Sequence, residues 1–234
     1  MPAPDQPRFT AGVAVVAWLF AFTAGVVGAT VITAATGHAG QKTNELPLWL
    51  IAVLELPLWA GLLGATVVVS RMWGTGSYRR DYGIAAHRVD LWGIPVGAVT
   101  QLVFVSLLYK GLSLMIDTKS LEKPAEDLTN KARGSFGVVL LVFVIAIGAP
   151  IVEEIFFRGL VQRSIAARYS DPVAIVGSAV MFALVHFQPL QFPGLLLFGL
   201  VAGYCAYRTR RLGMSMLAHM AFNGVSLAVL LARR

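Results

Sequence analysis

Long apolar runs dominate this chain, and the charged positions gather between them. A helix needs roughly 20 residues to cross a hydrocarbon core about 30 Å thick. Five runs reach that length and predict membrane-spanning helices: 11–35, 47–70, 91–116, 136–157 and 214–231. Two shorter runs, 172–185 and 193–207, would each extend roughly 21 Å at about 1.5 Å per residue. We expect these two to form a hairpin whose tip stops short of the far membrane surface.

Composition supports a fold that lies within the lipid bilayer. Of the 234 residues, 57% are hydrophobic and 13% are charged, whereas a soluble domain has about 45–50% apolar and about 25% charged residues. We therefore predict an all-α fold, a polytopic transmembrane helical bundle of about seven helices. An intramembrane polar cavity, open toward the cytoplasmic side, is expected to hold its functional groups. The only cysteine, Cys205, excludes an intramolecular disulfide and a thiolate metal cluster.

The net charge of +7 indicates membrane topology better than nucleic-acid binding, because no basic face or nucleic-acid-binding motif accompanies it. Basic residues cluster after alternate predicted spans, as they do in the cytoplasmic loops of multi-pass proteins. We expect the cell (plasma) membrane as the location, with these clusters inside. The clusters are Arg71, Arg79, Arg80 and Arg88 after the second run, Arg158, Arg163 and Arg168 at the end of the fourth, and Arg208, Arg210 and Arg211 after the sixth.

Glu153, Glu154 and Arg158 form a polar cluster in the fourth apolar run. Inserting an acid or an arginine at a helix centre costs about 2.5–3.5 kcal/mol, so three unpaired groups cost on the order of 8–10 kcal/mol. Glu154 and Arg158 are spaced i,i+4 and can pair along one helix face. Glu153 is rotated by about 100° from Glu154 and lacks that partner. The alternative is an interfacial helix end, where water reaches both acids.

Two later runs carry further polar groups. His186 lies at the tip of the predicted hairpin, and His219 and Asn223, spaced i,i+4, share one face of the last span. Singly, His186 suits a structural role, and the His219–Asn223 pair suits hydrogen bonding between membrane helices. With Glu153 they supply a carboxyl, two imidazoles and a carboxamide, which can converge in a bundle core. Peptide hydrolysis needs a base, an acid and oxyanion donors, and this set contains each of them.

Three motifs in this order resemble the motif set of the CPBP (Abi) family, which covers type II CAAX prenyl endopeptidases and bacteriocin-processing or immunity proteins. The motifs are Glu153-Glu154-x-x-x-Arg158, Phe182-x-x-x-His186 and His219-x-x-x-Asn223. The resemblance implies a CPBP-type catalytic helical core over 134–234. Residues 1–133 would supply N-terminal transmembrane helices and loops of the same integrated membrane domain.

The same resemblance implies an intramembrane endopeptidase that hydrolyses a peptide bond in a membrane-embedded or lipid-modified substrate. Each motif residue then takes an expected role. Glu153 and His186 would activate the attacking water, His219 and Asn223 would stabilise the oxyanion, and Glu154 and Arg158 would support them.

Cofactor use has two interpretations, because members of that family have been described as metalloproteases and as metal-free glutamate-dependent proteases. In the first, Glu153, His186 and His219 would be the ligands of a catalytic zinc. The chain lacks the His-Glu-x-x-His signature of zinc peptidases. Asn223 at a donor position requires no ion, so we favour an enzyme without a cofactor.

Two other functions compete with proteolysis. A proton-coupled transporter is one, since intramembrane Glu and His residues also mark ion pathways; the missing inverted repeat counts against it. A non-catalytic membrane immunity or partner protein is the other. The presence of every motif position favours hydrolysis over both.

Overall fold

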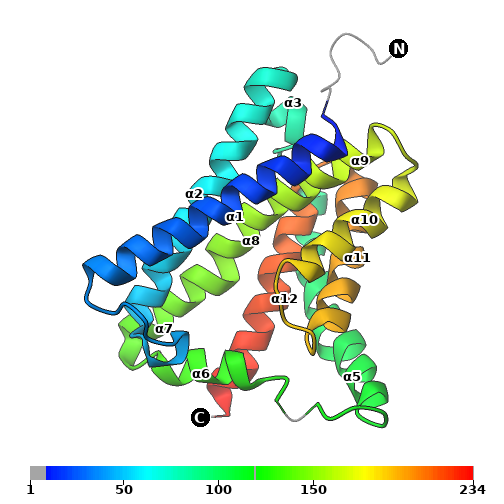
Figure 1. Ribbon diagram of the computed structural model, residues 1–234. Helices are drawn as coiled ribbons and strands as arrows, with labels where there is room; N and C mark the ends of the chain where they lie inside the picture. Colours follow the sequence, from blue (N-terminus) through cyan, green and yellow to red (C-terminus); the bar gives the residue numbers. More distant parts are fainter. Residues whose placement is uncertain (1–8, 119, 234) are drawn as a thin grey trace.

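The computed structural model describes residues 9–118 and 120–233, which fold into helices without a β-strand (Figure 1). This confirms the all-α prediction. In chain order the helices are α1 (Ala11–Ala35), η1 (Thr43–Glu45), α2 (Leu48–Trp73), α3 (Tyr78–Tyr82), η2 (Arg88–Trp92), α4 (Gly93–Val99), η3 (Thr100–Val105), α5 (Ser106–Leu112), α6 (Lys123–Lys131), α7 (Gly134–Val142), η4 (Phe143–Gly148), α8 (Ala149–Glu153), η5 (Glu154–Gln162), α9 (Arg163–Ala166), α10 (Asp171–Leu184), α11 (Phe192–Thr209) and α12 (Gly213–Ala232).

Five continuous helical segments are long and apolar enough to cross a membrane, and each coincides with one of the five long apolar runs. They are α1, α2, the segment from η2 to α5, the segment from α7 to α9, and α12. The two shorter runs form α10 and α11, which lie side by side as the predicted hairpin. The 14 residues of α10 extend roughly 21 Å at about 1.5 Å per residue.

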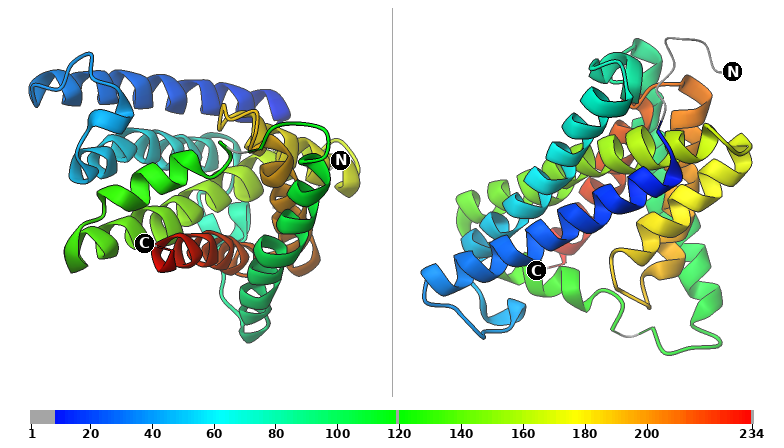
Figure 2. Two further views of the ribbon diagram at one scale, coloured as in Figure 1. Left: turned by 90° about the horizontal axis from the view of Figure 1, so that it is seen from below. Right: turned by 45° about the horizontal axis from the view of Figure 1, so that its top comes forward.

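Helices α1 and α2 pair at the edge of the bundle, and α1 also contacts η5 and α9 (Figure 2). Small residues allow their close approach. A Cβ on Gly61 would lie 2.9 Å from the Cα of Ala21, and Pro57 in α2 fits against Gly28 of α1. Such contacts between small residues are a common way for membrane helices to pack without a hydrophobic driving force between them.

The segment from α7 to α9 crosses the middle of the bundle and contains two of the three π-helical stretches, η4 and η5; the third is η3. π-Helix is rare, and its short stretches are frequent at functional sites. Pro150 contributes at η4 because it has no backbone N–H to donate to the preceding turn. None of the three π-helical stretches was predicted from the sequence.

The central helix continues to Ala166, well past the apolar run that we predicted to end at 157. Assigning Arg158 to a cytoplasmic basic cluster was therefore wrong. Its side chain is fully buried within η5 and paired with Glu154. The pairing removes the cost of an isolated charge, which is why the helix passes through the polar cluster instead of ending there.

The remaining basic clusters lie at one end of the bundle, as predicted. Arg163 Nη2 donates to the carbonyl of Arg210 over 2.9 Å, and Leu212 N donates to the carbonyl of Gly83 over 3.0 Å. These contacts join the loops after α2, α9 and α11. In Figure 1, α3 and α9 mark this end, and α5, α6 and the chain's C-terminal end mark the opposite one.

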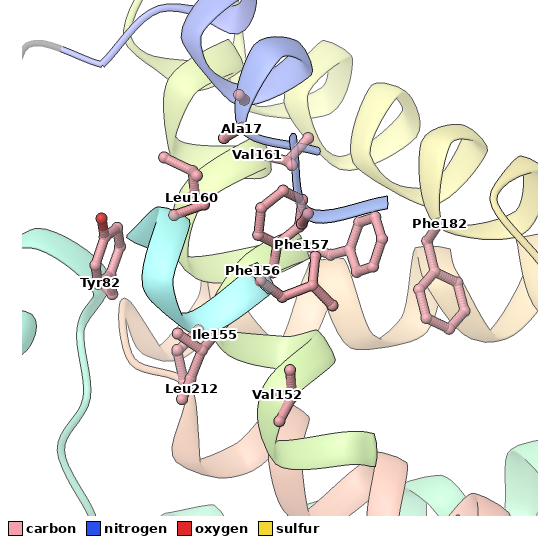
Figure 3. Packing of buried hydrophobic residues seen from close by; sticks show 14 of the residues in the cluster. Ala17, Tyr82, Val152, Ile155, Phe156, Phe157, Leu160, Val161, Phe182 and Leu212 are labelled. Atoms are coloured by element: carbon pink, nitrogen blue, oxygen red, sulfur yellow. The ribbon is translucent and has the colours of Figure 1, made fainter. Parts of the chain in front are cut away.

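An aromatic and aliphatic core packs around η5 next to the basic end (Figure 3). Phe156, Leu160 and Phe182 are almost completely buried, and the Phe157 ring meets the Phe182 ring edge-on at 5.4 Å. Leu212, just before α12, closes the core from the other side. This core fixes the relative positions of η5, α10 and α12, the three elements that carry the sequence motifs.

Candidate active site

Glu154, Arg158 and His219 form a fully buried charged cluster between η5 and α12. Glu154 Oε1 lies 3.2 Å from Arg158 Nη1 and 2.9 Å from His219 Nδ1. The i,i+4 pairing of Glu154 with Arg158 predicted from the sequence is therefore present. Because a carboxylate can only accept, His219 Nδ1 carries a proton, and the hydrogen bond fixes the orientation of the imidazole ring.

Arg158 also holds the neighbouring helices in place. Its Nη2 donates to the carbonyl of Gly199 over 3.2 Å, and its guanidinium carbon lies 4.6 Å from the centre of the Phe182 ring. One turn along, Gln162 Nε2 donates to the carbonyl of Gly203 over 3.0 Å. The glycines permit this approach, and a Cβ on Gly199 would come within 3.0 Å of Ala179.

Glu153, at the end of α8, points away from the Glu154–Arg158 pair. Its Oε2 lies 3.7 Å from His219 Nε2, and its side chain is 21% exposed, whereas Glu154 is fully buried. The two consecutive acids thus have different environments, as expected from their rotation about the helix. A separation of 3.7 Å is too long for a direct hydrogen bond. His219 accordingly presents one nitrogen to each acid.

His186 lies two residues beyond α10 and is half-buried. Its Nδ1 donates to the carbonyl of Phe182 over 2.6 Å, which leaves Nε2 as the free nitrogen. The His186 ring centre lies 4.7 Å from that of Phe182, and the His219 ring centre lies 5.7 Å from the same ring. The two imidazoles therefore flank one phenyl ring, and His186 reaches the other motif residues through Phe182.

Asn223 makes its hydrogen bond to the central helix. Its Nδ2 donates to the carbonyl of Ile145 over 2.9 Å. The Ile145 carbonyl lacks the usual donors from its own helix. The N–H of Ala149 donates to the carbonyl of Val144, as in a π-helix, and Pro150 has no N–H to donate. Asn223 thus satisfies a backbone group that the π-helix releases, and one amide hydrogen remains for another partner.

A cavity of about 420 Å³ extends from Asn223. Its wall combines apolar side chains with a few polar ones from η3, α5, α6, α11 and α12, and Glu122 and Arg233 lie at its α6 end. It extends toward the α5–α6 end of the bundle, whereas we expected a cavity open toward the basic clusters. The buried side chains of Phe156, Leu160 and Leu212 fill the basic end.

The side chains do not form the three-ligand set that the zinc alternative requires. Within residues 9–118 and 120–233, no group of three or more His, Cys, Asp or Glu side chains is placed to hold a metal ion. Glu153 and His219 approach each other, whereas both imidazoles lie against the Phe182 ring.

Sequence reasoning assigned no role to the carboxamides of Gln101 and Gln162. Gln162 ties η5 to α11, and Gln101 lines the cavity beside Asn223. An isolated polar side chain in the apolar run 91–116 was a signal that could have found Gln101, whereas Gln162 lies beyond the run 136–157 and gave no such signal. Glu55, an acid within the apolar helix α2, makes no hydrogen bond with the described residues.

The part of the chain that holds these residues is similar to a known protein family. Residues 135–225 match the family model described as type II CAAX prenyl endopeptidase, Rce1-like. The matched segment contains all six predicted site residues and confirms the resemblance found from the motifs. Comparisons with curated proteins and with solved structures gave no match. This segment is thus similar to type II CAAX proteases, and the five apolar helices indicate an integral membrane protein.

Proposed function

We propose that this chain, whose residues 135–225 match the type II CAAX prenyl endopeptidase model, is an intramembrane endopeptidase acting on a membrane-associated, lipid-modified peptide or protein. The observation that carries the proposal is the convergence of Glu153 and His219, at 3.7 Å, with His219 held by the buried Glu154–Arg158 pair. In the proposal, 134–234 form the catalytic core and 1–133 add surrounding helices.

Glu153 is the general base in this mechanism. Its carboxylate takes a proton from a water molecule as the water oxygen attacks the scissile carbonyl carbon. When the carbon–nitrogen bond breaks, the same proton passes to the leaving amine, and the carboxylate is restored. His186, with Nε2 free, assists in activating the water. A positioned acid or base typically contributes about 10²- to 10⁴-fold, so loss of Glu153 should cost about that factor.

His219 and Asn223 stabilise the oxyanion. Glu154 accepts the Nδ1 hydrogen of His219, and this contact stabilises an imidazolium whose Nε2–H can donate to the developing negative charge. Asn223 contributes its remaining amide hydrogen. Arg158 is a positioning residue because it holds Glu154 and, through it, the His219 ring. Each lost oxyanion donor typically costs about 10²–10³ in kcat.

We propose that the reaction uses no metal ion, with zinc as the alternative. The support is the donor set, in which a carboxylate, an imidazole and a carboxamide supply base and donors without a cation. The substrate class follows from the description of the family. We propose a prenylated protein ending in Cys-aliphatic-aliphatic-X at the cytoplasmic face of the cell membrane.

The test is cleavage of farnesylated peptides ending in Cys-aliphatic-aliphatic-X by the purified, detergent-solubilised protein. We expect cleavage by the wild type and a loss of about 10²-fold or more in kcat for both Glu153→Gln and His219→Ala. Asp171→Asn is the matched control, since Asp171 pairs with Arg210 at 3.3 Å on the surface. Its rate should equal that of the wild type.

Several results would contradict the proposal. Absence of cleavage with every lipidated peptide, combined with proton or solute flux in sealed vesicles, would identify a transporter. Tight binding of a partner protein without turnover would identify a non-catalytic membrane protein. Inactivation by a chelator with recovery on adding zinc would replace the metal-free mechanism with a metal-dependent one.

A further inference from the structure

Gln101 is an uncharged polar residue placed inside an apolar spanning segment. It is the second residue of the π-helical stretch η3, whose neighbours Leu102, Val103 and Phe104 are exposed on the lipid-facing surface. It lies outside the segment 135–225 that matches the protease family. A polar group at this depth needs a hydrogen-bond partner, because lipid supplies none.

The packing of α4 on α12 brings Gln101 level with the active site. A Cβ on Gly93 would collide with the backbone of Met214, and a Cβ on Gly97 would collide with that of Ala218. Helices α4 and α12 therefore run in the same direction, and a step of four residues along α4 matches a step of four residues along α12. One further turn places Gln101 beside Phe222 and Asn223, and all three line the same cavity.

The carboxamide of Gln101 makes no hydrogen bond with any residue that the structure describes. Its Oε1 is fully buried and unpaired, whereas Nε2 retains accessible surface next to the cavity. Two other carboxamides in the bundle are used structurally: Gln162 donates to the carbonyl of Gly203 and Gln191 to that of Leu121. An unsatisfied buried polar atom costs about 1–3 kcal/mol. Gln101 is thus a polar group without a structural partner at the edge of the cavity.

We propose that Gln101 is a substrate-binding residue whose carboxamide hydrogen-bonds a main-chain peptide group of the substrate in this cavity. Nε2 is the accessible end of the carboxamide, and the C=O of a substrate peptide unit is a suitable acceptor for its N–H groups. The bond holds the substrate chain in the cavity beside Asn223, the proposed oxyanion donor. This inference rests on the proposed endopeptidase function and adds a further helical segment, η3, to the substrate site.

The first test separates binding from chemistry. In Gln101→Met the shape is retained and the Nε2 donor is lost, so KM should rise about tenfold while kcat stays within about twofold. The dissociation constant of a fluorescent farnesylated peptide, measured in the Glu153→Gln background, should rise by the same factor. Val103→Ala is the control on the same turn, because Val103 faces lipid. Gln101→Ala serves as a second variant, and size-exclusion elution and melting temperature report folding.

The second test identifies the hydrogen bond itself. Peptides with a single backbone ester lose one N–H donor and have a weaker carbonyl acceptor. One ester position should weaken binding to the wild-type protein about tenfold and leave binding to the Gln101→Met protein unchanged. The proposal is overturned if, at every position, the ester weakens binding to the wild-type and Gln101→Met proteins by the same factor. It is also overturned if neither Gln101 variant changes the dissociation constant of the peptide. A fall in kcat with constant KM also overturns it. Failure of the wild type to cleave any peptide refutes the proposed function separately, because binding is measured without cleavage.

Discussion

Replacement of Arg158 by methionine tests whether the buried cluster is organised as the structure indicates. Methionine keeps much of the apolar stem but removes the guanidinium that lies 3.2 Å from Glu154 Oε1 and donates to Gly199. Both side chains are fully buried, so Glu154 would remain as a buried charge with His219 as its main partner. Breaking a buried ion pair on one side costs about 3–5 kcal/mol. We expect Arg158→Met to lower the free energy of unfolding by about that amount.

The double variant Glu154→Gln/Arg158→Met should recover most of this loss. With both charges removed, no uncompensated ion stays in the bundle, and such replacements are often close to neutral. We expect its unfolding free energy to lie within about 2 kcal/mol of the wild type, because the uncharged carboxamide introduced at position 154 needs only hydrogen bonds. The assay is equilibrium unfolding by dodecyl sulfate in mixed micelles, followed by the fluorescence of the 5 tryptophans.

Arg210→Met is the control for removing an arginine. Arg210 pairs with Asp171 at 3.3 Å, but its side chain is 70% exposed, and exposed pairs contribute about 0–1 kcal/mol. The reasoning is refuted if Arg158→Met and Arg210→Met lower the unfolding free energy equally. It is also refuted if the double variant is less stable than Arg158→Met alone.

Two further predictions concern helix packing. Asn223→Leu should lower the unfolding free energy by about 1–3 kcal/mol because the Ile145 carbonyl loses its donor. Adding Pro150→Ala, which restores a backbone N–H nearby, should reduce this loss. If the effects of the two substitutions are simply additive in the same unfolding assay, the explanation is contradicted. Gly97→Ala should destabilise the protein by about 1–3 kcal/mol, because the new Cβ meets the α12 backbone. Gly64→Ala, with nothing within 4 Å, should stabilise it by about 0.5–1 kcal/mol, and a loss of stability there would count against the packing described.

The apolar runs predicted the positions of the helices because insertion into lipid depends on local composition. The runs 172–185 and 193–207 became α10 and α11 with ends within two residues. The run 136–157 was extended at its C-terminal end, since the pairing of Glu154 with Arg158 cannot be distinguished locally from a charged helix end. The motif spacing likewise identified His186, His219 and Asn223 as unusual, since polar side chains in apolar runs are costly.

The i,i+4 spacing predicted the Glu154–Arg158 pair, but the partners of the other polar side chains could not be inferred from local pattern. The distance from His219 to Glu154 depends on how α12 packs on η5, and the Asn223 bond depends on a carbonyl released by a π-turn 78 residues away. The position of Gln101 beside Asn223 follows from glycine contacts between α4 and α12. The amino-acid order thus specified which segments enter the membrane and which groups are costly there, because those energies are local sums. Apart from the Glu154–Arg158 pair within one helix, helix packing decided which of those groups meet, since hydrogen bonds and ion pairs act over a few ångströms between segments far apart in the chain.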